Sequence, residues 1–170
     1  MTDFFNKTDL SRKDAENIVS DTLNNCDDGE LYLENSKSES IILDDDRIKS
    51  SSYSSDLGYG LRAITGEVVA YSHSNEISKN SLKQSADNLK STLKSKKGTY
   101  NNSISKTNEK FYNNINPIEK KSLNSKLELL KEVNNYVRSK GAIVQQVTAS
   151  FAGEHKAIEI IRSGGEVLTD

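Results

Sequence analysis

The chain has 170 residues, of which 34% are hydrophobic and 28% charged, with a formal net charge of -2 and no tryptophan. This length suits one domain with a single core, and the nearly balanced charge excludes a strong basic field for nucleic acid or an anionic membrane. A single cysteine, no signal-peptide pattern and no apolar run of about 20 residues together predict a cytoplasmic protein that neither enters nor binds a membrane.

Residues 11–26 are predicted to form an amphipathic helix. Ser11 and Asp14 have the spacing of a capping box, and apolar residues follow at helical intervals until Gly29. Cys26 falls on the apolar stripe and is interpreted as a small buried side chain, because a nucleophilic role would need a histidine beside it.

Residues 31–71 alternate between apolar and polar types, with Ser, Asp and Gly between the short runs. This pattern predicts an antiparallel meander of about five short strands. The aspartates at 44–46 lack the spacing and the distal Glu of a calcium loop, so they are predicted to form a hairpin tip. Gly66 and Glu67 are predicted to form the next turn, before a returning strand at 68–71.

A second helix is predicted to start at Ser78 and to end at Gly98, because apolar residues recur along it at steps of four, three and four. Residues 96–115 are rich in Ser, Asn, Thr and Lys and lack periodicity. They are predicted to form a long surface loop that is the most mobile internal segment.

A third helix is predicted to start at Asn116-Pro117, with Glu119 completing the cap. Its inward side chains are expected to be the following: Leu123, Leu127, Leu130, Val133 and Val137. Two further strands are predicted at 143–151 and 156–162, joined at Gly153-Glu154.

The predicted fold class is therefore α+β, with an antiparallel meander sheet, about three helices packed on one face and two further strands near the C-terminus. Gly164-Gly165 is expected to turn the chain into another strand at 166–168. Because this strand would begin unpaired just before Asp170, we expect a domain truncated before the rest of a longer protein.

The glycines Gly58 and Gly60 stand out as candidate site residues. With Ala63 they satisfy a dinucleotide fingerprint, but that motif needs a helix directly after the glycine turn, and residues 64–69 predict strand and turn. We expect these glycines to adopt positive φ or to allow a close backbone approach. Arg62 can clamp a peptide carboxylate with two hydrogen bonds, or form a salt bridge across the sheet.

No catalytic or metal constellation is apparent in the sequence. His73 and His155 lie far apart and outside any His-x-x-x-His or Cys-x-x-Cys array, whereas zinc needs three or four converging ligands. The serines lack a Gly-x-Ser-x-Gly elbow. We therefore predict no catalytic residue and no metal ligand in this chain.

The stretch from Tyr53 to Ser78 combines a Gly-x-Gly-x-Arg strand at 58–62 with the Gly66-Glu67 turn. In this order it resembles the N-terminal domain of the TldD/PmbA family of zinc metalloproteases. The resemblance runs from roughly residue 28 to residue 170, takes in the hairpin at 39–52 and the late strand at 144–153, and leaves out the segment from 94 to 116. The Gly-Glu turn and the Val-Thr-Ala-Ser strand at 147–150 are more similar to the TldD branch.

This resemblance implies a non-catalytic domain. The family's zinc-binding His-Glu-x-x-x-His helix lies beyond the similar segment, and no such pattern occurs here, so zinc is expected only in a full-length protein and this chain is expected to be inactive alone. It further implies a PmbA/TldE-like partner or a homodimer, and peptide or unfolded polypeptide substrates that its strands guide by edge pairing. Gly58, Gly60, Arg62 and Glu67 are then candidates for substrate contact or assembly. The alternative is a freestanding α+β binding or assembly module with no protease activity.

Overall fold

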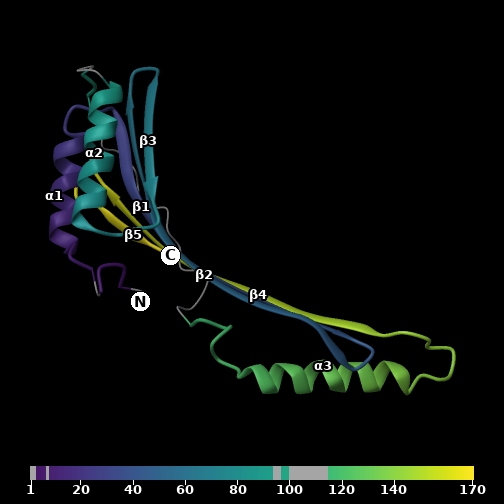
Figure 1. Cartoon of the computed structure of the whole chain (residues 1–170). Coiled ribbons are helices and arrows are strands. Elements are labelled where there is room, and N and C mark those ends of the chain that lie inside the picture. Colours follow the sequence, from purple (N-terminus) through teal and green to yellow (C-terminus); the bar gives the residue numbers. More distant parts are fainter. Residues whose placement is uncertain (1–2, 7, 94–96, 100–114) are drawn as a thin grey trace. The chain divides into compact units, whose positions relative to one another are not determined.

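The computed structural model describes residues 3–6, 8–93, 97–99 and 115–170. Of the loop predicted at 96–115, only 97–99 and 115 fall within the described residues, so this prediction is untested. The elements in chain order, labelled in Figure 1, are α1 (Arg12–Leu23), β1 (Asp28–Asp44), β2 (Arg47–Thr65), β3 (Val68–Ser74), α2 (Lys79–Leu93), α3 (Leu123–Arg138), β4 (Thr148–Arg162) and β5 (Val167–Thr169).

The five strands form one antiparallel sheet in the order β3-β2-β1-β4-β5. The α+β class is confirmed, but the first half of the sheet is a meander of three strands rather than about five short ones. Two of these strands are long, with 17 residues in β1 and 19 in β2. The Ser-rich and charged stretches were predicted to be turns, but they continue β1 and β2. A strand that is exposed on both faces needs no alternation of apolar and polar residues, so this pattern does not reveal it.

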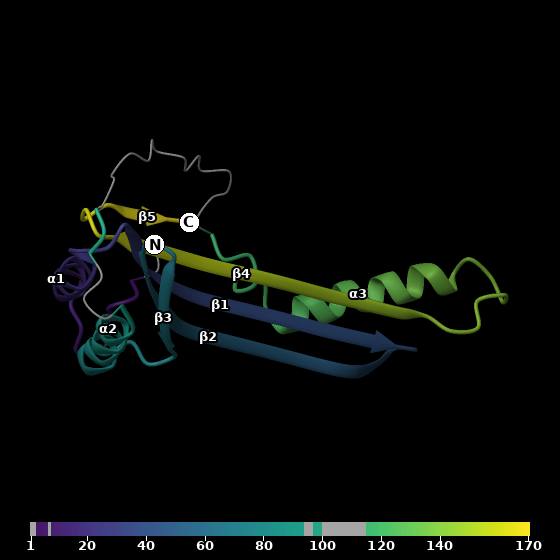
Figure 2. The same ribbon diagram turned by 90° about the horizontal axis from the view of Figure 1, so that it is seen from above.

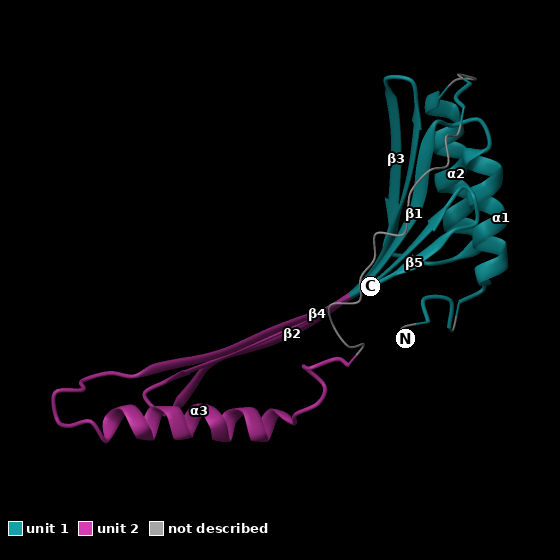
Figure 3. Ribbon diagram, turned by 180° about the vertical axis from the view of Figure 1, so that it is seen from behind, with its two compact units in different colours: residues 1–35, 56–114, 157–170 teal, residues 36–55, 115–156 magenta. Residues whose placement is uncertain are grey.

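Two compact units share this sheet and are coloured separately in Figure 3. Unit 1 comprises residues 1–35, 56–114 and 157–170, and unit 2 comprises residues 36–55 and 115–156. The strands β1, β2 and β4 contribute residues to both units. Each unit is described below by itself.

In unit 1, α1 and α2 lie side by side on one face of the sheet (Figures 1 and 2). Strand residues alternate, so that Leu31, Leu33, Leu61 and Ala63 are buried toward the helices while their neighbours are more exposed. The helices supply the following buried side chains: Ala15, Val19, Leu23, Leu82, Ala86, Leu89 and Leu93. Both apolar stripes predicted from the sequence are therefore confirmed.

The ends of unit 1's helices agree in part with the prediction. Ser11 caps α1 and its side chain accepts a hydrogen bond from the Asp14 amide, as expected. The helix ends at Leu23, earlier than expected, yet Cys26 is buried at 3% exposure just beyond it. Phe4 and Leu10 also enter this core, a contribution that the sequence pattern did not indicate.

Unit 2 packs α3 against β1 and β4 through the buried residues Ile41, Leu43, Leu130 and Ala149. The helix begins at Leu123 with Ser122 as its cap, so the predicted start at Asn116-Pro117 is wrong. Asn116 does accept a hydrogen bond from the Ile118 amide, but this closes a turn that precedes the helix.

The face that α3 buries also differs from the prediction. Leu130 is buried, but Leu123 and Val133 are 48% and 42% exposed, while Lys126 and Asn134 are buried at 5% and 2%. The Lys126 ammonium bonds to the Glu39 carboxylate and to the Ile118 carbonyl oxygen, the latter at 2.7 Å. A buried ion pair therefore sets the rotation of the helix, and apolar periodicity alone could not predict this.

The C-terminal half of the sheet corrects a further expectation. The strands predicted at 143–151 and 156–162 are joined in one continuous strand, β4, which runs through Gly153 without a turn. This strand begins at Thr148, so residues 143–147 of the first predicted strand precede it. The turn expected at Gly164-Gly165 is present, with Gly165 at φ 77°. β5 then pairs with β4 through Ile160↔Leu168, so the late strand is not unpaired.

Candidate functional site

The predicted site residues lie on the β2–β3 hairpin of unit 1. Because Leu61 and Ala63 face α1 and α2, Gly60 and Arg62 point to the opposite face of the sheet, which we call the outer face. Cross-strand pairing adds Tyr71 opposite Arg62 and His73 opposite Gly60. The outer face comprises the following described residues: Asp28, Glu30, Tyr32, Gly60, Arg62, Ile64, Val69, Tyr71, His73 and Arg162.

Exposed side chains of β3 cover Gly60. A Cβ on Gly60 would lie 2.6 Å from the Tyr71 hydroxyl oxygen, so the Tyr71 side chain passes directly over this glycine. The rings of Tyr71 and His73 stack with centroids 5.8 Å apart, and Tyr71 is 63% exposed. Val69 is 59% exposed on the same strand, so β3 presents an apolar and aromatic row to solvent.

Neither candidate glycine has the positive φ that was offered as one explanation of its presence, since the positive-φ glycines of the described residues are Gly66, Gly141 and Gly165. Close approach, the other explanation, does apply. A Cβ on Gly58 would lie 2.9 Å from the Ser74 carbonyl oxygen. Both glycines lie inside β2 with no helix after them, which excludes the dinucleotide loop.

Arg62 is held in a charged row across three strands. Its Nε and Nη2 atoms bond to the two carboxylate oxygens of Glu30 at 2.7 and 2.8 Å, and Nη2 lies 3.4 Å from Asp28. Asp28 in turn accepts a bond from Arg162 of β4 at 2.5 Å. The pKa of Arg62 is raised, first by the hydrogen bond to Glu30, so its guanidinium stays charged.

This row fixes side-chain positions more than it stabilises the fold. The Arg62 side chain is 38% exposed, and ion pairs at that exposure contribute about 0–1 kcal/mol each. Next to it, Tyr32 donates a hydrogen bond to Glu34 at 2.6 Å, and burial followed by that bond raises the pKa of Tyr32 to about 12. The outer face is therefore charged and ordered at β1 and aromatic at β3, an arrangement suited to binding rather than to acid–base chemistry.

Glu67 is separate from this group. It is exposed in the two-residue turn between Thr65 and Val68, where Gly66 has a φ of 60°. Asp27 holds this turn, because its carboxylate accepts hydrogen bonds from the amides of Gly66 at 2.6 Å and Thr99 at 2.7 Å. Sequence reasoning missed Asp27, and no local pattern marks it, since both donors are distant in the chain.

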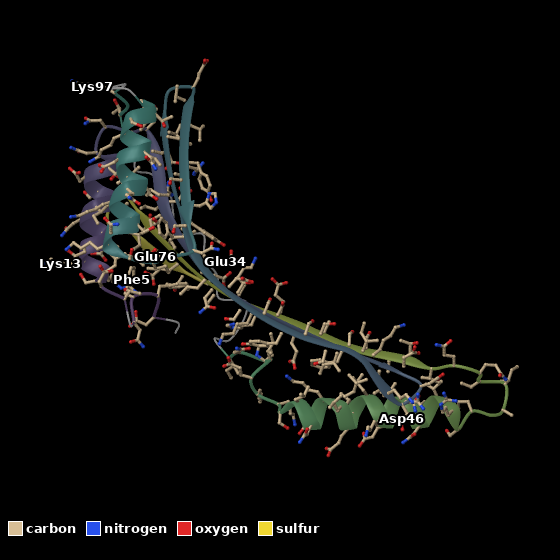
Figure 4. All side chains as sticks on the ribbon, viewed as in Figure 1. Phe5, Lys13, Glu34, Asp46, Glu76 and Lys97 are labelled. Atoms are coloured by element: carbon tan, nitrogen blue, oxygen red, sulfur yellow. The ribbon has the colours of Figure 1, made fainter. Side chains whose placement is uncertain are left out.

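Metal ligands are not assembled in the described residues. No group of three or more His, Cys, Asp and Glu side chains there could hold a metal ion. His73 stacks on Tyr71, and the Cys26 thiol donates to the Thr22 carbonyl oxygen at 3.8 Å. The aspartates at 44–46 form the predicted hairpin tip, with Asp45 and Asp46 at φ 46° and 64°, and Figure 4 labels Asp46 there. Among the described helices, none combines the length and apolarity needed to cross a membrane.

Sequence comparison with known proteins relates this chain to a family. The PmbA/TldA metallopeptidase domain 1 matches residues 29–94, which include all four predicted site residues. The metalloprotease TldD homolog of Buchnera aphidicola subsp. Acyrthosiphon pisum is 36% identical over 145 residues and 85% of this chain. The chain belongs to the TldD/PmbA family. The Haemophilus influenzae TldD homolog is 32% identical over 152 residues and 86% of the chain.

The TldD/PmbA match extends to the fold but covers part of each relative. The chain spans 30% of the Buchnera protein and 31% of the Haemophilus protein. TldE from Thermococcus kodakarensis has the same fold, with a TM-score of 0.65 and 13% sequence identity over 92% of this chain and 36% of its own. Residues 29–94 thus correspond to domain 1 of this family, in a chain that spans about a third of the length of these relatives.

Proposed function

We propose that this chain is the non-catalytic N-terminal domain of a TldD-like metallopeptidase, in which it supports dimer assembly and peptide access to a zinc site outside these 170 residues. The observation that carries the proposal is the match of residues 29–94 to domain 1 of the family, together with relatives named as metalloproteases.

The donor groups of the described residues do not form a zinc centre. Zinc in proteins is held by three or four converging Cys, His, Asp or Glu side chains, and no such group is present in the described residues. No step of the proposal therefore passes through a metal in this chain. Peptide hydrolysis belongs to another part of a longer protein, and the 170-residue chain alone is expected to be inactive.

The outer face is the surface that we assign to assembly. Tyr71 and Val69 offer exposed apolar area on β3, and Arg62 offers a fixed guanidinium beside them. Aromatic side chains and Arg are the types that most often dominate protein interfaces. Gly60 leaves room on this surface for the Tyr71 side chain, and Gly58 allows the close approach of the Ser74 backbone. Glu67 is a further candidate that lies apart from the outer face, in the turn between β2 and β3. The partner is a PmbA/TldE-like protein or a second copy of the chain.

The test compares two tyrosines of equal exposure. Tyr71 is 63% exposed on the outer face, and Tyr136 is 64% exposed on α3 of unit 2. Light scattering is measured on the chain alone and mixed with a PmbA/TldE-like protein from the same organism, and it should show a complex. Tyr71→Ser should raise the Kd of this complex at least about tenfold, the equivalent of about 1.4 kcal/mol. Tyr136→Ser serves as the matched control and should leave the complex intact. Equal effects of both variants, or no complex with either partner, would favour the freestanding module.

A further inference from the structure

One edge of β2 in unit 2 has no partner among the described strands over residues 47–55. β3 pairs with β2 only from Tyr59 to Thr65, and in the sheet order β3-β2-β1-β4-β5 no other described strand reaches that side. Every residue from 47 to 55 is exposed. Successive residues of a strand direct their N–H and C=O groups to alternate sides, so every second residue here offers both groups to the open edge.

In the described residues, the side-chain hydrogen bond and ion pair that join residues 47–55 to the rest of unit 2 go to β1. Ser54 exchanges a hydrogen bond with Ser38 of β1 at 2.9 Å. The apolar core of unit 2, as far as the structure describes it, draws its residues from β1, α3 and β4 and none from β2. Both faces and the free edge of residues 47–55 are therefore open to a second polypeptide.

The side chains of this edge favour a peptide over a second copy of the chain. Residues 47–55 contain Arg47 and Lys49 and no acidic residue, and five of the others are serines. When two antiparallel copies pair about Ser51, Lys49 lies opposite Tyr53 and Arg47 opposite Ser55, so four positive charges come together and no residue of 47–55 supplies a carboxylate opposite them. An acidic partner strand would neutralise them.

Nearby carboxylates do not supply this neutralisation in full. Asp44 accepts hydrogen bonds from Gln146 and Thr148, each at 2.9 Å, and lies 3.5 Å from Lys49. Asp45 pairs with Arg138 of α3. Both carboxylates thus serve contacts to other elements of unit 2, and Arg47 stays exposed beside the edge.

We propose that residues 47–55 bind an extended, acidic segment of substrate polypeptide as an additional antiparallel strand. The backbone supplies the affinity and the small serine side chains leave room on both faces, so recognition tolerates many sequences and selects for extended conformation and negative charge. This inference rests on the proposed function, because it assigns a site to the peptide that a TldD-like protease would receive.

The experiment measures amide hydrogen exchange of the 170-residue chain by NMR, with and without a nine-residue peptide that alternates valine and serine and carries two glutamates. The peptide should slow exchange at every second amide of residues 47–55 by at least about tenfold. A control peptide with proline at alternate positions lacks the necessary N–H groups and should have no effect. Protection of the same amides before peptide is added, or protection of β3 instead, would overturn the proposal.

Two proline variants test the edge independently. Ser51→Pro and Ser52→Pro remove adjacent N–H groups that point to opposite sides of β2. The variant whose removed N–H group points toward β1 should have a lower melting temperature than the parent. The variant facing the edge should keep the parent melting temperature and bind the peptide at least about tenfold more weakly. Unchanged peptide binding by that variant contradicts the proposal. If both proline variants unfold, Arg47→Glu replaces them as the test, because it should weaken peptide binding without unfolding the chain.

The outcomes separate this inference from the proposed function. Zinc-dependent peptidase activity of the full-length protein, combined with an edge that the peptide never protects, refutes the edge site and leaves the proposed function standing. If the peptide protects the edge but the full-length protein has no peptidase activity, the edge site stands and the proposed function is refuted. Concentration-dependent dimers that protect residues 47–55 without peptide would identify a second copy as the occupant and overturn the proposal.

Discussion

Gly29→Ala tests how closely β1 and β2 pack in unit 1. A Cβ at Gly29 would lie 2.5 Å from the Arg62 carbonyl oxygen and 2.7 Å from Cδ2 of Leu23, whereas heavy-atom contacts are favourable at about 3.5 Å or more. The carbonyl belongs to the backbone of the neighbouring strand, and Leu23 is fully buried. Neither can move away without shifting β2 or α1.

The expected loss follows from this geometry. Overpacking of a well-filled core costs about 1–3 kcal/mol, and the upper end applies where the obstructing atom is backbone. Replacing glycine returns about 0.4–1 kcal/mol through the unfolded chain. The net loss in the free energy of unfolding should be about 2 kcal/mol, or about 4–8 °C in melting temperature for a chain of this size.

Urea denaturation of the parent, Gly29→Ala and Gly60→Ala, followed by circular dichroism, measures this difference. Gly60 is the matched control, because its Cβ would meet only the outer end of the exposed Tyr71 side chain, 2.6 Å away, which can turn into solvent. Gly60→Ala should therefore stay within about 0.5 kcal/mol of the parent. A loss for Gly60→Ala as large as that for Gly29→Ala would refute the reasoning.

Three further predictions concern two charged groups and the absence of zinc binding. Lys126→Met leaves Glu39 buried without its cation and should lower the free energy of unfolding by about 3–5 kcal/mol, and Glu39→Gln added to it should recover much of that loss in the same urea assay. The pKa of Asp27 is lowered by hydrogen bonds from the Gly66 and Thr99 amides. The ionised Asp27 carboxylate therefore contributes its full stability above its ordinary pKa of 3.8, and this contribution is lost as the pH falls through the lower pKa of the folded state. By NMR, the amide chemical shifts of Gly66 and Thr99 should follow this titration, and Asp27→Asn should abolish it. The purified 170-residue chain should lose added zinc to mild chelation and cleave no peptide, and stoichiometric zinc retained by metal analysis contradicts this.

Local patterns predicted the parts of unit 1 that local forces determine. The capping box at Ser11, the stripes of α1 and α2 and the turn at residues 66–67 depend on neighbours within a few residues. The same holds for the aspartate hairpin tip. Such features can be predicted because cap, helix face and turn are each set by short-range geometry.

Long-range contacts explain what the sequence did not predict. α3 buries Lys126 because its ammonium pairs with Glu39, and local patterns could not predict this since Glu39 is distant in the chain. Periodicity alone predicted Val133 of α3 to be a core residue, but it is exposed. At the candidate site, the order of Gly58, Gly60 and Arg62 predicted an extended strand, and β2 contains all three residues. The pairing of Arg62 with Glu30 and the cover that Tyr71 gives Gly60 depend on cross-strand register, which one strand's sequence does not determine.

The central claim, that this chain is the non-catalytic first domain of a TldD-like metallopeptidase, is tested most directly by sequencing the reading frame beyond the codon for Asp170. The account predicts that the frame continues and encodes a His-Glu-x-x-x-His helix. A frame that stops at this codon, or that continues without any such metal-binding pattern, would contradict it.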